Sequence, residues 1–232
     1  LRQLARCGGR VRTGAGAARQ DVNVSVEGGT RVEIKGVCSL REVGQLTHNE
    51  ALRQRSLLGI RGELQRRGVT VESIAERVVD VTPQVRGTAC GYIAQAVGQG
   101  AVVGACPLPG FQGLLQLSTQ PRTSFLKEFS DRVRVIACLD TLPNLVCSTG
   151  AAPSLSSTEW GRVSKACGVD GDVPVLVVWG PRADVETAAR EIAIRARDAV
   201  KGVPNETRQA LDDGTNGFER ILPGADRMSP ES

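Results

Sequence analysis

The stretch RQDVNVSVEGGTRVEIKGV, residues 19–37, decides how the first part of this chain folds. Apolar and polar residues alternate on both sides of Gly28-Gly29, and the even positions carry Val22, Val24, Val26, Val32 and Ile34. Alternation with a period of two around a glycine turn is typical of two half-buried strands, so the sequence predicts a β-hairpin. A three-residue loop over 27–29 keeps the polar residues on one face and supplies a glycine for the left-handed position of the turn.

This loop length fixes which side chains face one another across the hairpin. The predicted register pairs polar residues: Ser25 with Arg31, Asn23 with Glu33, and Asp21 with Lys35. Cross-strand neighbours lie about 5 Å apart, so Asp21 and Lys35 are expected to be close enough for an ion pair. Two interpretations stay open: the solvated outer face of a hairpin, or a preorganised polar floor that holds a charged ligand.

The composition bounds the class of protein. The chain has 232 residues, a formal net charge of +4 and 41% hydrophobic residues, which suffices for a core in one or two domains. It shows no signal peptide and no apolar run near the roughly 20 residues that span a bilayer, so we expect no membrane partner and a cytoplasmic location. Because the chain begins with Leu1 rather than Met and stops abruptly at Ser232, we interpret it as a fragment of a longer protein.

Cysteine and histidine usage argues against a metal cluster or a disulfide framework. The seven cysteines form no Cys-x-x-Cys pair, and His48 is the only histidine. We therefore expect free, buried thiols in a reducing cytosol. Arginine dominates the basic residues, since only four of the 29 are lysine. The planar guanidinium suits phosphate and nucleic acid, although a biased genome composition would give the same excess.

Residues 39–67 predict one long helix. Apolar residues recur at helical spacing before Gly68: Val43, Leu46, Leu57, Ile60 and Leu64. The sequence SLRE at 39–42 predicts a capping box between Ser39 and Glu42. Six arginines are expected on the exposed faces: Arg41, Arg53, Arg55, Arg61, Arg66 and Arg67. They form either a solvated surface or a face for RNA or a partner protein.

From about residue 70 predicted strands alternate with predicted helices. GAVVGACPLPG (100–110) and VPVLVVWG (173–180) predict strands, and residues 181–202 predict a helix that begins at a proline and ends at a glycine. TSFLKEFSDR predicts a helix, and VRVIACLD (133–140) predicts a strand after it. Together these elements predict a compact α+β domain over 70–202 that can fold alone.

Two further features of the second half carry expectations. The aromatic residues there lie too far apart in the sequence to predict a base-stacking platform: Tyr92, Phe111, Trp160 and Trp179. Residues 203–232 are polar and rich in loop-forming residues, so their composition alone predicts a surface linker.

Several segments, in their order along the chain, resemble the E-type subunit of the archaeal glutamyl-tRNA(Gln) amidotransferase. They are the hairpin stretch, SLREVGQL, ALRQRSLLGIRGELQRRG and the final LPGADRM. The related B-type subunit of bacteria shows a less similar pattern. The region between resembles the insertion domain that the family shares with bacterial aspartyl-tRNA synthetase. The resemblance implies an α+β fold in which a β-hairpin and a long helix belong to a cradle-type core (1–69). The insertion domain (70–202) interrupts that core, and a return segment (203–232) completes it.

The resemblance also implies an activity. The family is an ATP-dependent ligase that phosphorylates the γ-carboxylate of glutamate on tRNA(Gln). Ammonia from an asparaginase-like partner subunit then displaces phosphate to give Gln-tRNA(Gln). ATP and magnesium are the implied cofactors, and the full-length protein is expected to form a heterotetramer with that partner.

The implied site residues are members of the hairpin motif: Arg19, Asp21, Asn23, Glu33 and Lys35. We expect Arg19 and Lys35 to bind ATP by offsetting phosphate charge. Asp21 and Glu33 are expected to orient those bases or to contact metal through water. Asn23 is expected to donate to a carbonyl or phosphate oxygen.

The chain departs from the family pattern at Ala18, Cys38 and Ser229. The upstream cradle segment, which carries the family's main magnesium carboxylates, and the C-terminal tRNA-gripping domains are missing. We therefore expect this fragment to be inactive alone. The competing interpretation is a non-catalytic tRNA-binding or assembly module of an aminoacyl-tRNA synthetase-like protein, carried by the arginine-rich helix and the insertion.

Overall fold

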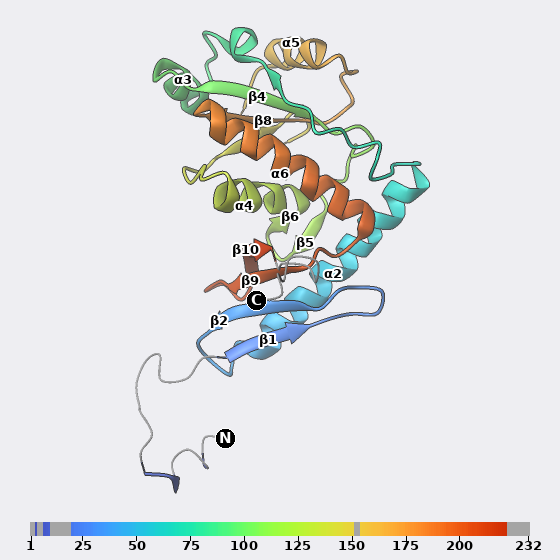
Figure 1. The fold of residues 1–232 in the computed structure, drawn as a ribbon, viewed down its shortest axis with the longest axis vertical. Coiled ribbons are helices and arrows are strands. Elements are labelled where there is room, and N and C mark those ends of the chain that lie inside the picture. The colour runs from blue at the N-terminus through green and yellow to red at the C-terminus, as the bar shows by residue number, and fades with distance from the viewer. Residues whose placement is uncertain (1–2, 4–6, 10–19, 151–153, 222–232) are drawn as a thin grey trace, which may run out of the picture.

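The computed structural model describes residues 3, 7–9, 20–150 and 154–221 of the chain. The expectations on Ala18, Arg19, the LPGADRM segment at 222–228 and Ser229 lie outside the described residues. The fold is α+β, as predicted, and it contains two four-stranded sheets with helices between and above them (Figure 1).

The predicted hairpin is present. Strand β1 (Gln20–Val24) pairs antiparallel with β2 (Val32–Val37), and Asn23 lies opposite Glu33 as predicted. Gly28 occupies the left-handed region of the turn with φ of +74°. The alternation of the sequence therefore gave the correct register near the turn.

The register shifts at the open end of the hairpin. Val22 lies opposite Ile34, but Gln20 lies opposite Val37, so β2 carries one extra residue there. Gly36 takes φ of +74° at this bulge, where a β-carbon would also collide with the amide nitrogen of Gln209.

The predicted ion pair between Asp21 and Lys35 is not formed among the described residues. The bulge sets the single residue Asp21 opposite both Lys35 and Gly36, so the one-to-one pairing with Lys35 is lost. A period-two pattern cannot reveal a bulge, because the alternation on either side of it is unchanged.

Helix α2 (Val43–Arg66) follows the hairpin and begins later than predicted. The Ser39 hydroxyl accepts a hydrogen bond from the Arg41 amide at 3.2 Å and forms a local turn instead of a capping box. Four residues of the predicted apolar stripe are buried: Leu46, Leu57, Ile60 and Leu64.

The described part of the return segment, residues 203–221, contains a second hairpin, so the linker expected there from composition was wrong. Strand β9 (Glu206–Ala210) pairs parallel with β2 and antiparallel with β10 (Asn216–Ile221). The first sheet thus has the order β1-β2-β9-β10. The two hairpins lie side by side although most of the chain separates them in sequence (Figure 1).

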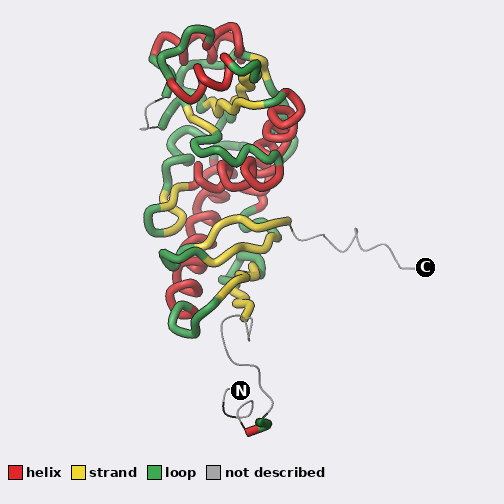
Figure 2. Tube along the Cα trace, turned by 90° about the vertical axis from the view of Figure 1, so that its left-hand side faces the viewer, coloured by secondary structure: helices red, strands yellow, loops and turns green. Residues whose placement is uncertain are grey.

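The second sheet is antiparallel with the order β3-β4-β8-β7. Its strands are β3 (Val79–Asp80), β4 (Val102–Pro107), β8 (Val175–Gly180) and β7 (Leu145–Cys147). The short 3-10 helix η1 (Thr82–Val85), α3 (Gly91–Gly98) and α5 (Ser157–Cys167) cover one face. Helices α4 (Phe125–Ile136) and α6 (Arg182–Lys201) cover the other face, next to the small β5 (Ser118–Gln120) and β6 (Thr123–Ser124) pair (Figures 1 and 2).

Helix α4 replaces the strand that VRVIACLD predicted. Phe125, Phe129 and Val133 are all buried, so the helical spacing of four continues past the point where the β-branched residues begin. The predicted strands at β4 and β8 and the predicted helix at α6 are confirmed.

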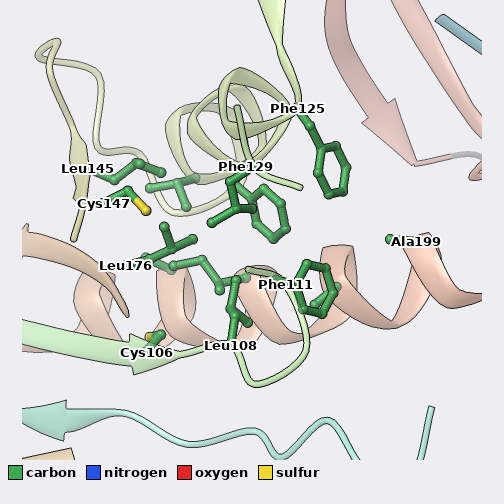
Figure 3. Packing of buried hydrophobic residues seen from close by; sticks show 14 of the residues in the cluster. Cys106, Leu108, Phe111, Phe125, Phe129, Leu145, Cys147, Leu176 and Ala199 are labelled. Atoms are coloured by element: carbon green, nitrogen blue, oxygen red, sulfur yellow. The ribbon is translucent and has the colours of Figure 1, made fainter. Parts of the chain in front are cut away.

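The largest hydrophobic core joins the two halves of the molecule. Its centre is formed by Phe111, Phe125 and Phe129 against Leu108 and Leu176 (Figure 3). The same cluster includes Val32, Leu57, Ile60 and Leu64 from the hairpin and α2. The boundaries drawn at 70 and 202 therefore separate segments that share buried surface, and independent folding of 70–202 stays a prediction.

The cysteines are all free thiols. Burial is confirmed for Cys90, Cys106, Cys147 and Cys167, whereas Cys7, Cys38 and Cys138 are exposed. Burial raises the pKa of the Cys106 thiol to about 12, so this thiol is not a nucleophile near neutral pH.

Candidate functional site

The candidate site is one face of the first sheet. The apolar residues of the hairpin point the other way, and Val24, Ile34 and Val37 pack with Leu46 of α2. The alternation therefore leaves Asp21 and Asn23 exposed and Glu33 and Lys35 half-buried on the opposite face.

These four side chains make no hydrogen bond or ion pair with another residue in the described part of the chain. Two carboxylates, an amide and an ammonium thus share one strand pair with unused donors and acceptors. The fifth predicted residue, Arg19, lies outside the described residues, so its place beside them stays a prediction.

The return strand extends this face, which sequence reasoning missed. In the parallel β2–β9 pairing Glu33 lies next to Thr207, and Lys35 lies next to Gln209. Neighbours in register point to the same side of a sheet, so the row Asn23–Glu33–Thr207 crosses three strands. The turn residues DDG at 212–214, which follow ETRQAL, were the local signal that could have predicted a hairpin here.

Helix α2 clamps the hairpin from behind through Gln54. Its Nε2 donates to the Val24 carbonyl at 3.1 Å, and its Oε1 accepts from the Val26 amide at 3.1 Å. The same Nε2 also donates to Glu50 at 3.0 Å. Because Gln54 is fully buried, these bonds fix where β1 ends relative to the helix.

Beneath the sheet lies a buried charge network drawn from four elements. It contains three carboxylates and three guanidinium groups: Glu50 and Arg53 of α2, Glu128 of α4, Arg195 of α6, and Glu206 and Arg208 of β9. The equal numbers of opposite charges leave this network with no net charge.

Arg53 lies at the centre of this network, so its placement on an exposed face was wrong. Its guanidinium donates to Glu128 at 2.5 Å, to Glu206 at 2.5 Å and to Glu50 at 3.1 Å. Arg208 donates to Glu206 at 2.7 Å. Helical spacing places Arg53 on the same buried stripe as Glu50 and Leu57. An arginine is normally exposed unless it is paired, and the sequence does not show which distant carboxylates pair with Arg53.

The network sets the ionisation of its members. Burial alone would raise the pKa of Glu128, but the positive charges of Arg53, Arg208 and Arg195 hold that pKa well below its usual range. Burial would lower the pKa of Arg53, whereas Glu128, Glu50 and Glu206 raise it well above its usual value. Burial lowers the pKa of Arg195, which Glu128 only partly offsets. Glu128 and Arg53 are therefore ionised at neutral pH.

The polar face fits part of a magnesium site. Asp21 and Glu33 offer hard carboxylate oxygens, the donor type that Mg²⁺ prefers. The described residues contain no group of three or more His, Cys, Asp and Glu side chains that could hold a metal ion by themselves.

None of the helices in the described part is long and apolar enough to cross a membrane.

Comparison with known proteins assigns the chain to a family. A family model described as the GatB/GatE catalytic domain matches residues 1–221, so the chain belongs to the GatB/GatE catalytic-domain family. The match includes the hairpin, the insertion and the return strands.

Curated relatives carry a more specific name. The chain is 40% identical over 227 residues to the E-type subunit of glutamyl-tRNA(Gln) amidotransferase from Pyrococcus horikoshii, a match that covers 96% of this chain and 34% of that protein. It is 36% identical over 233 residues to the protein of the same name from Methanocaldococcus jannaschii, covering 99% and 36% respectively. The chain spans about a third of the length of the curated relatives it matches.

Proposed function

We propose that this chain is part of the subunit that activates glutamate in an ATP-dependent glutamyl-tRNA(Gln) amidotransferase, working in the cytoplasm with an ammonia-supplying partner. The observation that carries the proposal is the polar face of the first sheet, whose Asp21, Asn23, Glu33 and Lys35 are backed by a buried, charge-balanced network. The family assignment and the relatives' names support the same reaction class.

In the proposed reaction the γ-carboxylate of tRNA-bound glutamate attacks the γ-phosphorus of ATP, and the bond to the ADP oxygen breaks. Ammonia then attacks the carbonyl carbon of the acyl phosphate, inorganic phosphate leaves, and the amide of Gln-tRNA(Gln) results. Charge builds on phosphoryl oxygens in the first step, so the site must supply cations and donors there.

The hairpin residues have roles that follow from their chemistry. Lys35, together with Arg19, offsets the charge on the phosphate groups of ATP. Asn23 donates from its amide to a carbonyl or phosphoryl oxygen. Glu33 and Asp21 orient the bases or hold water on a magnesium ion, which would supply further charge neutralisation when bound. Mg²⁺ at a nucleotide site is usually held by one or two carboxylates together with water and phosphate oxygens, so water and the phosphates of ATP would complete the shell of an ion that Asp21 and Glu33 touch.

The test uses the whole protein that contains this chain, together with its ammonia-donating partner. Lys35→Ala and Glu33→Gln should lose amidation of Glu-tRNA(Gln) while keeping tRNA binding. Lys165→Ala and Glu186→Gln, which change exposed residues of the insertion, should keep full turnover. Full activity of both hairpin variants would contradict the proposed role and favour the interpretation of this face as a solvated outer surface.

A further inference from the structure

A cleft of about 320 Å³ opens at the far end of the second sheet. It lies between α3 and the loop at 138–144, next to the end of β8. This place is opposite the first sheet along the long axis of the molecule (Figure 1). The cleft is therefore separate from the polar face of the hairpins.

Two aromatic side chains form one wall of the cleft. The rings of Tyr92 and Trp179 stack with centroids 5.3 Å apart and an angle of 22° between their planes. Both residues are half-buried and both line the cleft. The fold therefore brings together two aromatic residues that are too scattered in sequence to predict a stacking platform.

The rim of the cleft is polar. Gln95 and Gln99 lie one helical turn apart, both are exposed, and neither side chain is hydrogen-bonded to another described residue. Asp140 and Thr141 line the opposite side. None of the described residues that line the cleft is a lysine or an arginine, so this lining does not neutralise a phosphate group.

We infer that this cleft binds an unpaired nucleobase of RNA, and, on the proposed function, a base of the tRNA substrate. A flat ring can extend the Tyr92–Trp179 stack, and every base has the π-face that such stacking needs. Amide groups both donate and accept hydrogen bonds, so Gln95 and Gln99 can pair with the edge of a base that is turned out of its stack.

The adenine of ATP is the other source of the same chemistry. A bound triphosphate needs cations around its phosphates, and the described lining supplies none. A base turned out of an RNA strand leaves its phosphates outside the cleft, where they require nothing from the lining. The charge of the cleft therefore favours RNA over ATP.

The experiment measures quenching of 2-aminopurine riboside fluorescence by the whole protein. The wild type should quench saturably, and an unmodified tRNA(Gln) transcript should displace the probe. Trp179→Leu should weaken the binding of the probe by about 5- to 150-fold, the range expected from the loss of one base–aromatic stack. Trp160→Leu, which removes a half-buried tryptophan on α5, is the matched control and should bind as the wild type does.

A second variant guards against loss of folding. Gln99→Ala removes an exposed side chain and should weaken the binding of the probe by about 2- to 13-fold, whereas Gln65→Ala on α2 should not. Unchanged quenching in both Trp179→Leu and Gln99→Ala would overturn the inference, and so would displacement by ATP but not by tRNA. The outcome of this binding test does not depend on whether Lys35→Ala and Glu33→Gln lose amidation activity, because Lys35 and Glu33 lie at the other end of the molecule.

Discussion

Arg53 is a fully buried arginine whose guanidinium group contacts three carboxylates from three different elements. A buried charge is tolerated only when partners replace the water it has lost, so each member of the network depends on the others. Because Glu206 and Arg208 belong to the strand beside β2, this network also fixes the strand that completes the polar face.

Replacing Arg53 should therefore be costly. Arg53→Met leaves Glu50, Glu128 and Glu206 without their shared cation and should lower the free energy of unfolding by about 3–5 kcal/mol. Arg55→Met changes an exposed arginine of the same helix and should stay within about 0.5 kcal/mol of the wild type. Urea denaturation of the 232-residue chain at pH 7 measures both, and equal effects would contradict the assigned network.

Glu128 should make stability depend on pH in the acid range. Its pKa is held below the ordinary carboxylate value of about 4.3, so its contribution is complete above that value and is lost as the pH falls through the folded-state pKa. Between about pH 5 and pH 2, the free energy of unfolding should fall more steeply in the wild type than in Glu128→Gln. Glu186→Gln should retain the wild-type slope, and a wild-type slope in Glu128→Gln would rule out this role.

At the scale of the elements, the contact between α2 and the hairpin depends on Gln54. Gln54→Ala breaks two hydrogen bonds to the backbone of residues 24 and 26 and should cost about 1–3 kcal/mol of stability. Hydrogen exchange at the Val26 amide should also become faster than in Gln65→Ala, whose residue is exposed on the same helix. Unchanged exchange at Val26 would show that the clamp does not hold the hairpin.

The sequence predicted those elements whose pattern is local. Alternation around Gly28 gave the register of Asn23 with Glu33, and helical spacing gave the stripe of Leu57 and Leu64. The prediction of a capping box at Ser39 was wrong, because the chain forms a turn at Ser39 and the helix begins after it.

The rest of the fold depends on contacts between distant residues. The return strand pairs with β2, but its residues follow the insertion and carry no mark of their partner. Arg53 was misplaced for the same reason, since its partners Glu128 and Glu206 lie 75 and 153 residues away. The polar face of the first hairpin was predictable, whereas its extension by Thr207 and Gln209 was not.

At the scale of the whole molecule, the insertion is tied to the core through apolar and charged contacts. One hydrophobic cluster contains residues from both parts. Glu128 of the insertion forms an ion pair with Arg53 of the core, and Arg195 of the insertion forms an ion pair with Glu128. The position of the insertion therefore bears directly on the sheet that carries the candidate site.

This coupling predicts a difference between the whole chain and its middle part. Residues 70–202 expressed alone should unfold at a lower urea concentration than the whole chain, because α4 and α6 lose their packing against the core. Glu128→Gln should cost less than about 1 kcal/mol in the isolated segment, where the side chain is freed from Arg53, and several times more in the whole chain. Equal costs in the two contexts would show that the insertion is energetically independent.

The most direct test of the proposed role is phosphorylation of glutamate measured apart from amidation. In the whole protein, with no ammonia donor present, release of ADP from ATP should depend on Glu-tRNA(Gln). Lys35→Ala should abolish that release while tRNA binding is kept, and Lys165→Ala should leave it unchanged. Release of ADP by Lys35→Ala at the wild-type rate would contradict the assignment of the hairpin face to the phosphorylation site.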